Sequence, residues 1–263
     1  MAIGEAPDMT GEAKSRSNIH IPGEQEELIK AIKATGKPVV VLLMAGRPMV
    51  FNWTAENVPS IVYAWWLGTQ GGNAMADVLY GDYNPSGKLP ITFPRSEGQI
   101  PIYYNHYNTG RPAKSDTDLF YVSAYNDLRN SPQYAFGHGL SYTTFEYQNM
   151  ELGKFKPSVK GLKPIQVSFI VKNTGKRAGE EVVQLYIRDM VSQPVRPIKE
   201  LKDFKKIMLQ PGEARRVTFT IKRDELAFYN DKLERITQPG TFQIMIGGAS
   251  DDIRLQKSFN LTN

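Results

Sequence analysis

The chain has 263 residues, of which 41% are hydrophobic and 22% are charged, and its net charge is +5. These values are typical of a globular protein with one large domain or two ordinary ones. The sequence contains no cysteine, which excludes disulfide bonds, and no apolar run long enough to predict a membrane span.

The basic excess is uneven along the chain. Between Lys154 and Arg223 there are 17 Lys and Arg residues against 6 Asp and Glu residues. A basic domain can bind nucleic acid or an anionic membrane. Here the basic residues are spread over alternating segments, without a cluster or an interleaved set of aromatic residues. Solvated strand faces are therefore the favoured interpretation, and nucleic-acid binding is not.

The first third of the chain begins as a loop and continues as alternating helix and strand. Residues 1–21 are polar and contain two Gly-Glu pairs, Gly4-Glu5 and Gly11-Glu12. Residues 24–35 have acids in their first turn and apolar residues at helical spacing, which predicts a helix. The continuous apolar run 39–44 is typical of a strand buried on both faces of a parallel sheet.

The next segment has the order of elements found in an α/β layer. Residues 61–66 predict a strand. Apolar residues at helical spacing over 74–79, stopped by Gly81, predict a helix. Residues 84–87 have the composition of a turn, and residues 89–93 predict another short strand. Strand, helix, turn and strand in this order indicate helices packed on a sheet.

A glycine pair, Gly71-Gly72, precedes the second helix. Glycines before a helix N-terminus can form a phosphate-binding loop. The Lys-Ser/Thr of a P-loop and the third glycine of a dinucleotide fingerprint are both missing. We therefore expect close backbone packing at this pair, and no cofactor.

The rest of the chain changes character twice. Residues 99–131 are rich in Tyr, Asn and Asp without a helical period, and so long an irregular stretch is usually functional or clamped between domains. Short β-type runs then follow, separated by turns containing Gly, Pro or Asn. They lie at 166–172, 182–188, 216–221 and 242–246, and they predict a β-sandwich.

Four long segments carry a family resemblance: GTQGGNAMADVLYGDYNPSGKLPITFP at 68–94, TGRP at 109–112, FGHGLSYTTF at 136–145 and KELKDFKKIMLQPGE at 199–213. They resemble glycoside hydrolase family 3, the β-glucosidase and β-xylosidase family. The resemblance covers nearly the whole chain in order. Two residues depart from it: Gln70 stands where the family has Glu, and Ala124 where it often has Arg.

The resemblance implies an α/β fold in two domains. Residues 1–150 would form part of an α/β sandwich, a mostly parallel sheet with flanking helices. Residues 151–263 would form an antiparallel fibronectin type III-like β-sandwich. In this family a large N-terminal barrel comes first, and Ile3 lies where a strand should be ending. We therefore expect the C-terminal portion of a longer enzyme, with a sheet edge or apolar surface left uncovered.

Retaining glycoside hydrolysis needs two carboxyl groups, one as nucleophile and one as general acid/base. A flexible glycine loop can carry the acid/base over a pocket built elsewhere. Thr10-Gly11-Glu12, followed by Arg16, resembles the acid/base loop of the family, so Glu12 is the predicted catalytic residue. Glu5, in the other Gly-Glu pair, is the alternative.

The same resemblance places the nucleophile outside this chain, because in the family it is an aspartate of the barrel. Asp77 lies among apolar neighbours in the predicted helix, and Asp82 lies beside a turn. Both are interpreted as structural. The chain would therefore hold half of a catalytic pair.

Histidines could serve as metal ligands or sugar contacts. His20, His106 and His138 have no partner at metal-ligand spacing, so no metal site is predicted. His20 lies between two isoleucines and is expected to be a strand residue. His106 lies in the tyrosine-rich stretch, where it could hydrogen-bond a sugar hydroxyl.

Tryptophan often stacks on sugar rings, and Trp65 and Trp66 are candidates. At the end of a buried strand, however, tryptophan is usually part of the core. At least one of the two is expected there.

The resemblance implies a β-linked oligosaccharide or glycoside as substrate, and the missing barrel portion or a second copy of the chain as protein partner. It also implies a periplasmic or secreted full-length enzyme, although residues 1–4 show no signal peptide. The alternative function is a non-catalytic, carbohydrate-associated scaffold module. An exposed Glu12 at an open interface beside an aromatic-lined hollow would favour the enzyme.

Overall fold

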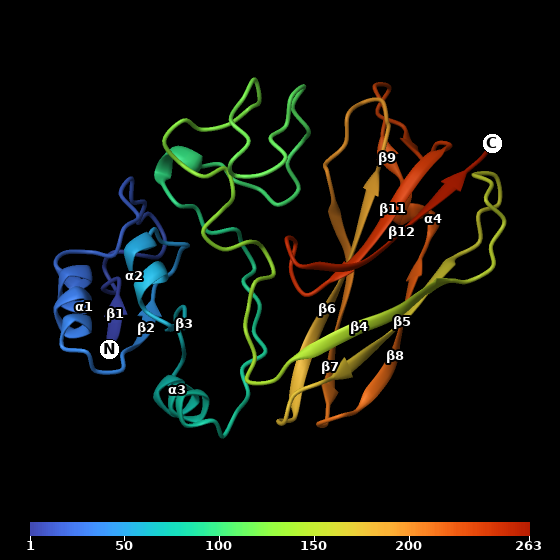
Figure 1. The fold of residues 1–263 in the computed structure, drawn as a ribbon. Helices are drawn as coiled ribbons and strands as arrows, with labels where there is room; N and C mark the ends of the chain where they lie inside the picture. The colour runs from blue at the N-terminus through green and yellow to red at the C-terminus, as the bar shows by residue number, and fades with distance from the viewer.

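The computed structural model describes residues 1–263, and Figure 1 shows two units joined by a long irregular segment. The N-terminal unit contains a parallel sheet in the order β1-β2-β3. Its strands are β1 (Ala2–Gly4), β2 (Val40–Met44) and β3 (Ser60–Tyr63), and its helices are α1 (Gln25–Ala34), α2 (Asn52–Asn57) and α3 (Gly71–Tyr80). The two predicted helices and the predicted strand 39–44 are confirmed, whereas α2 was not predicted.

The expectation of a mostly parallel sheet is wrong. Only three short strands pair in parallel, and every other ladder between strands is antiparallel. The strand predicted at 89–93 does not form. In this run only Phe93 pairs, in an isolated bridge with Tyr134. Pro90 and Pro94 lack the N–H group that a ladder requires, so this run cannot extend the sheet.

The core of the N-terminal unit is built from aromatic rings. Phe93 is fully buried, and its ring centroid lies 6.3 Å from Phe51, 4.8 Å from Tyr63 and 5.9 Å from Trp65. All three contacts are edge-on, the favourable geometry for aromatic pairs. Trp65 thus packs against the core, as expected for one of the tryptophans, whereas Trp66 is 44% exposed. The strand predicted over 61–66 ends at Tyr63, since Trp65 has a left-handed φ of 55°.

The N-terminal unit leaves apolar surface uncovered, as expected for part of a larger domain. Helix α3 has no buried residue although its apolar residues recur at helical spacing. Leu79 is 40% exposed and Tyr80 86% exposed. Both β1 and β3 are free edges of the small sheet. An edge of this kind is normally covered in a native protein.

Residues 81–144 connect the two units without forming a strand, and they include only one short 3-10 helix, η1 (Glu97–Gln99). Two lengths of this segment run side by side between the units (Figure 1). Hydrogen bonds of 2.8 Å from Leu89 N to His138 O and from Gly137 N to Leu89 O join them. The stretch 99–131 is irregular, as its composition predicted.

The C-terminal unit is a sandwich of two antiparallel sheets, in the orders β12-β11-β6-β7 and β4-β5-β8. Side chains from both sheets form one core of 18 buried residues. The elements are β4 (Phe145–Leu152), β5 (Ile165–Asn173), β6 (Gly179–Asp189), β7 (Glu200–Leu209), β8 (Ala214–Ile221), α4 (Arg223–Leu226), β9 (Phe228–Tyr229), β10 (Arg235–Ile236), β11 (Gly240–Gly247) and β12 (Ile253–Leu261).

The four predicted sandwich strands correspond to β5, β6, β8 and β11, whereas β4, β7 and β12 were not predicted. Strand β4 runs across the proposed boundary between residues 150 and 151 and pairs with β5. The division into 1–150 and 151–263 stays a prediction. Basic side chains of β7 and β8, such as Lys206 and Arg215, are exposed and pair with Glu180 and Glu213, which agrees with solvated strand faces.

The turn at 84–87 ties the connecting segment to the sandwich. Asn84 Oδ1 accepts hydrogen bonds from Ser141 Oγ at 2.9 Å and Tyr142 N at 2.8 Å, and Asn84 Nδ2 donates to Ala178 O at 2.8 Å. A Cβ atom built on Gly179 would lie 2.6 Å from Asn84 Nδ2. A larger residue at Gly179 would therefore displace the Asn84 side chain from its place against the sandwich.

Candidate functional site

The carboxyl ends of parallel strands are the edge at which open α/β sheets place their functional groups. Glu5 follows β1 and Arg47 lies three residues after β2, so both lie at this edge. The loop that carries Glu12 begins directly after Glu5. Glu5, Arg47 and the loop that carries Glu12 therefore meet at one end of the small sheet.

Glu5 is an ion-paired structural residue. Its side chain is inaccessible to solvent, and its Oε1 lies 2.8 Å from Arg16 Nη1 and 2.9 Å from Arg47 Nε. Its Oε2 accepts a hydrogen bond from Gly46 N at 3.2 Å. Because both oxygens are engaged by protein donors away from solvent, Glu5 cannot reach the departing oxygen of a sugar.

Glu12 has the opposite environment. It lies in an exposed loop over residues 6–15, and its side chain makes no hydrogen bond or ion pair with the protein. The backbone before it turns at Gly11, whose φ of +115° is one that L side chains rarely adopt. A carboxyl group without partners on a loop at this edge is free to act on a bound molecule.

Two backbone turns shape the loop. Met9 N donates to Ala6 O at 3.0 Å, and Lys14 N donates to Gly11 O at 3.2 Å. Arg47 Nη2 donates to the carbonyl oxygens of Met9 and Lys14, both at 2.8 Å. The loop therefore has a defined conformation although it is exposed.

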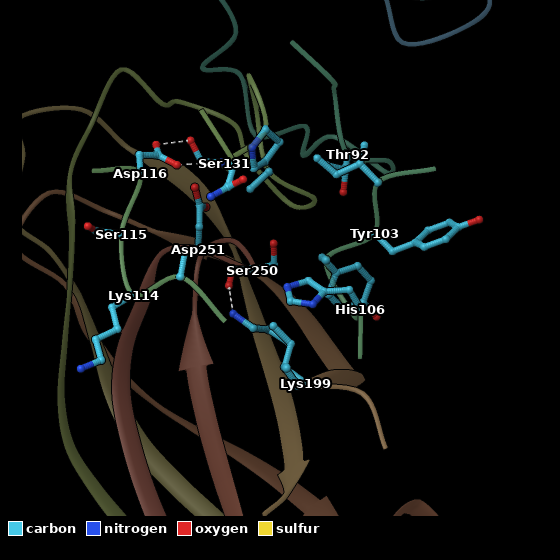
Figure 2. Close-up of a pocket in the computed structure, with 17 residues that line it drawn as sticks. Thr92, Tyr103, His106, Lys114, Ser115, Asp116, Ser131, Lys199, Ser250 and Asp251 are labelled. Atoms are coloured by element: carbon cyan, nitrogen blue, oxygen red, sulfur yellow. Dashed lines mark hydrogen bonds between the residues drawn. The ribbon is translucent and has the colours of Figure 1, made fainter. Parts of the chain in front are cut away.

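A separate hollow of about 430 Å³ lies between the irregular loop and one end of the sandwich. Figure 2 shows His106, Asp116, Lys199, Ser250 and Asp251 around it. Lys199 Nζ donates to Ser250 O at 2.6 Å, and burial lowers the pKa of Lys199. The hydrogen bond from the Ser131 hydroxyl lowers the pKa of Asp116. Polar and charged residues make up most of the lining, apolar atoms provide the larger part of the accessible surface, and Glu12 is not among the lining residues.

The histidines have three different environments. The backbone of His20 forms an isolated bridge with Val50, the strand-like role expected for it, and its ring lies 3.4 Å from Glu97. His106 lines the hollow, with Nδ1 2.9 Å from Tyr107 O. The His138 ring packs against Tyr134 in the connecting segment, with the two rings tilted and their centroids 4.9 Å apart, and burial lowers the pKa of His138. No group of three or more His, Cys, Asp or Glu side chains could hold a metal ion.

The remaining candidates have structural positions. Asp77 lies on α3 and Asp82 just after it, both with exposed side chains. A Cβ atom on Gly71 would lie 2.7 Å from Leu67 Cβ, which confirms close packing there, whereas Gly72 has nothing within 4 Å. None of the helices has the length and apolar character needed to cross a membrane.

The sequence analysis did not single out Arg47, which contacts Glu5 and the loop of Glu12. A signal for it exists in the sequence, since Gly46-Arg47-Pro48 directly follows the buried run that became β2. A charged residue in the turn after a buried strand lies at the edge where sites are built. The sequence did not show which carboxyl group it would contact.

The comparisons with known proteins agree with this arrangement. Residues 1–142 match the Glycosyl hydrolase family 3 C-terminal domain. The chain belongs to glycoside hydrolase family 3. Residues 181–250 of this family 3 chain also match a fibronectin type III-like domain, in the part that forms the β-sandwich.

Relatives of this family 3 chain are β-glucosidases and β-xylosidases. A periplasmic β-glucosidase of Salmonella typhimurium is 48% identical over 259 residues, which are 98% of this chain and 34% of that protein. A β-xylosidase of Formosa agariphila is 41% identical, over 97% of this chain and 34% of that protein. The chain thus spans about a third of the length of these relatives and matches the C-terminal portion of the family.

A solved structure extends the similarity to three dimensions. The crystal structure of a β-glucosidase from Listeria innocua in complex with glucose superposes with a TM-score of 0.93 at 38% identity. The match covers all of this chain and 36% of the Listeria chain. The fold described above is therefore that of the corresponding part of a β-glucosidase.

Proposed function

We propose that this chain is the C-terminal portion of a retaining β-glucosidase that hydrolyses terminal non-reducing β-D-glucosyl residues. In this proposal Glu12 is the general acid/base, and the portion absent from this chain supplies the nucleophile and most of the sugar pocket. The β-glucosidases among the relatives support the substrate class. The periplasmic relative supports a periplasmic full-length enzyme.

The observation that carries the proposal is the contrast between the two Gly-Glu pairs. Glu5 is buried against two arginines, whereas Glu12 is exposed and has no partner at the carboxyl edge of the sheet. A general acid must reach the leaving oxygen directly, so it needs an accessible carboxyl group. Glu12 meets this condition and Glu5 does not.

The scaffold alternative has one observation in its favour. The hollow beside His106 and Tyr103 is not lined by Glu12, so it could bind a carbohydrate without catalysis. The uncovered surface of α3 and the free edges of the sheet instead favour a chain completed by a further portion. This second observation favours the enzyme, because a self-sufficient module would cover its apolar surface.

The test uses a fused enzyme in which residues 1–263 replace the matching C-terminal third of the Salmonella typhimurium β-glucosidase. Glu12→Ala should lower kcat/KM by about 10²- to 10⁴-fold for glucosides with poor leaving groups, which depend on proton donation. Dinitrophenyl glucoside should keep its glycosylation rate, and added azide should restore turnover. Asp8→Asn is the matched carboxyl control and should leave the rates unchanged, because Asp8 is an exposed carboxyl group of the same loop whose side chain makes no hydrogen bond or ion pair. Equal loss for all leaving groups without azide rescue would contradict the assignment of Glu12.

A further inference from the structure

One guanidinium group closes the loop that carries Glu12. Arg47 Nη2 donates to Met9 O and to Lys14 O, both at 2.8 Å. These two carbonyl groups flank Glu12 along the chain, one on each side. A guanidinium holds its donors in a rigid planar fork, so it fixes the spacing of the groups it binds.

Arg47 is itself held in place by Glu5. Arg47 Nε lies 2.9 Å from Glu5 Oε1, and only 19% of the Arg47 side chain is exposed. The Tyr63 hydroxyl donates to the backbone carbonyl of Arg47, and Arg16 shares the same Glu5 oxygen. The contact with Glu5 is an ion pair and not a hydrogen bond, because Arg47 Nε has no hydrogen-bond partner, and the attraction between the two charges is stronger in this partly buried place than at the surface. Arg47 is therefore held at the sheet, and the exposed loop 6–15 is attached to it through Met9 O and Lys14 O.

The loop also approaches the sheet closely at a second place. A Cβ atom built on Gly46 would lie 2.2 Å from Thr10 Oγ1 and 3.0 Å from Trp66 Nε1. A larger residue at this position would force the Thr10 side chain to shift. Both contacts, one polar and one steric, join the loop to the turn after β2.

We propose that Arg47, anchored by Glu5, is a positioning residue that holds loop 6–15 so that Glu12 faces the bound glycoside. This inference rests on the proposed role of Glu12 and extends it to the residues that orient it. Glu5, the rejected acid/base candidate, thereby acquires a specific role as the anchor of Arg47. A displacement of about 1 Å in a catalytic group can cost about 10²-fold in rate. Loss of Arg47 should therefore slow the reactions that need the acid without removing the acid itself.

Two variants and a matched control separate positioning from general stability. Arg47→Ala removes all contacts, and Arg47→Lys keeps the charge near Glu5 but cannot bridge both carbonyl groups. Arg95→Ala is the control, because Arg95 also fastens loops: its Nε donates to Ser131 O at 3.0 Å and its Nη1 to Gln133 Oε1 at 2.7 Å. Arg95 makes no contact with loop 6–15.

The first measurement uses residues 1–263 alone and reports on the loop directly. Trypsin cleaves after Lys14, which lies in the loop, and mass spectrometry can follow this cut. Cleavage there should be about tenfold faster or more in Arg47→Ala, since hydrogen bonds to a charged group are lost, and unchanged in Arg95→Ala. Unchanged cleavage after Lys14 in Arg47→Ala would overturn the proposal.

The second measurement uses the fused enzyme and a series of aryl glucosides. Arg47→Ala should lower kcat/KM about 10- to 100-fold for poor leaving groups and little for dinitrophenyl glucoside, with Arg47→Lys in between. A uniform loss like that of Arg95→Ala, while Glu12→Ala stays selective, would refute positioning and leave the proposed function intact. If Glu12→Ala itself is not selective, the proposed function fails, and the positioning proposal fails with it even if trypsin shows that Arg47 holds the loop.

Discussion

Asn84 joins the turn at 84–87 to the end of the connecting segment and to the sandwich, and its replacement gives a measurable prediction. Asn84→Ala removes three hydrogen bonds of 2.8–2.9 Å, to Ser141, Tyr142 and Ala178. Each is worth about 0.5–1.5 kcal/mol net, so the full range is about 1.5–4.5 kcal/mol. The partners are partly exposed and can be rehydrated. We therefore expect the free energy of unfolding to fall by about 2 kcal/mol.

The assay is equilibrium unfolding in urea followed by circular dichroism and tryptophan fluorescence, together with thermal unfolding. A loss of about 2 kcal/mol corresponds to a fall in Tm of about 4–8 °C for a chain of this size. Asn108→Ala is the matched control, because Asn108 is an exposed loop residue whose side chain makes no hydrogen bond. It should change the free energy by less than about 0.5 kcal/mol.

A second variant tests the geometry of the same contact. Asn84→Asp keeps the shape and the acceptor oxygens but cannot donate to Ala178 O, and it places a carboxylate beside that carbonyl group. It should also destabilise the chain, through this one contact. If Asn84→Ala changes the free energy no more than Asn108→Ala, the Asn84 side chain does not stabilise the chain and the reasoning is wrong.

Three further predictions concern the core, a histidine and the open surface. Phe93→Ala should lower the free energy of unfolding by about 3–5 kcal/mol, because a fully buried ring is removed from an aromatic cluster. A loss below about 1 kcal/mol in urea unfolding would contradict this prediction. Burial lowers the pKa of His138 below its ordinary 6.5, so the unfolded chain binds the proton more readily than the folded chain. The free energy of unfolding should therefore fall as pH drops below about 6.5. His138→Phe should weaken this dependence in unfolding curves measured between about pH 5 and 7.5. The wild-type chain should self-associate in light scattering at micromolar concentration, and Leu79→Glu on α3 should shift it toward monomer, whereas an unchanged mass would show that α3 is not the contact.

The spacing of apolar residues in the sequence predicted several single helices and strands. The helical spacing of apolar residues before Gly81 predicted α3, and the apolar run predicted β2, because both signals lie in consecutive residues of one element. Strand β12 was missed although Ile253, Leu255, Phe259 and Leu261 alternate with polar residues. The lysine at 257 interrupts that alternation. The proline-containing run at 89–93 was wrongly predicted to be a strand. Its apolar residues pack within the connecting segment and do not pair in a sheet.

The candidate site was predicted only in part. Motif resemblance pointed to Glu12 but could not separate it from Glu5 on chemical grounds, because both are glutamates after a glycine. The structure separates them through burial and through the arginines that reach only Glu5.

The sequence by itself determined the family, the change from an α/β unit to a β-sandwich and the two carboxyl candidates, because motifs and periodicity are written in consecutive residues. Only the tertiary structure decided that Glu5 is engaged, that Arg47 fastens the loop of Glu12 and that Asn84 holds the sandwich. These contacts join residues from separate elements. Their existence depends on which strand ends meet in space, and no local pattern records that.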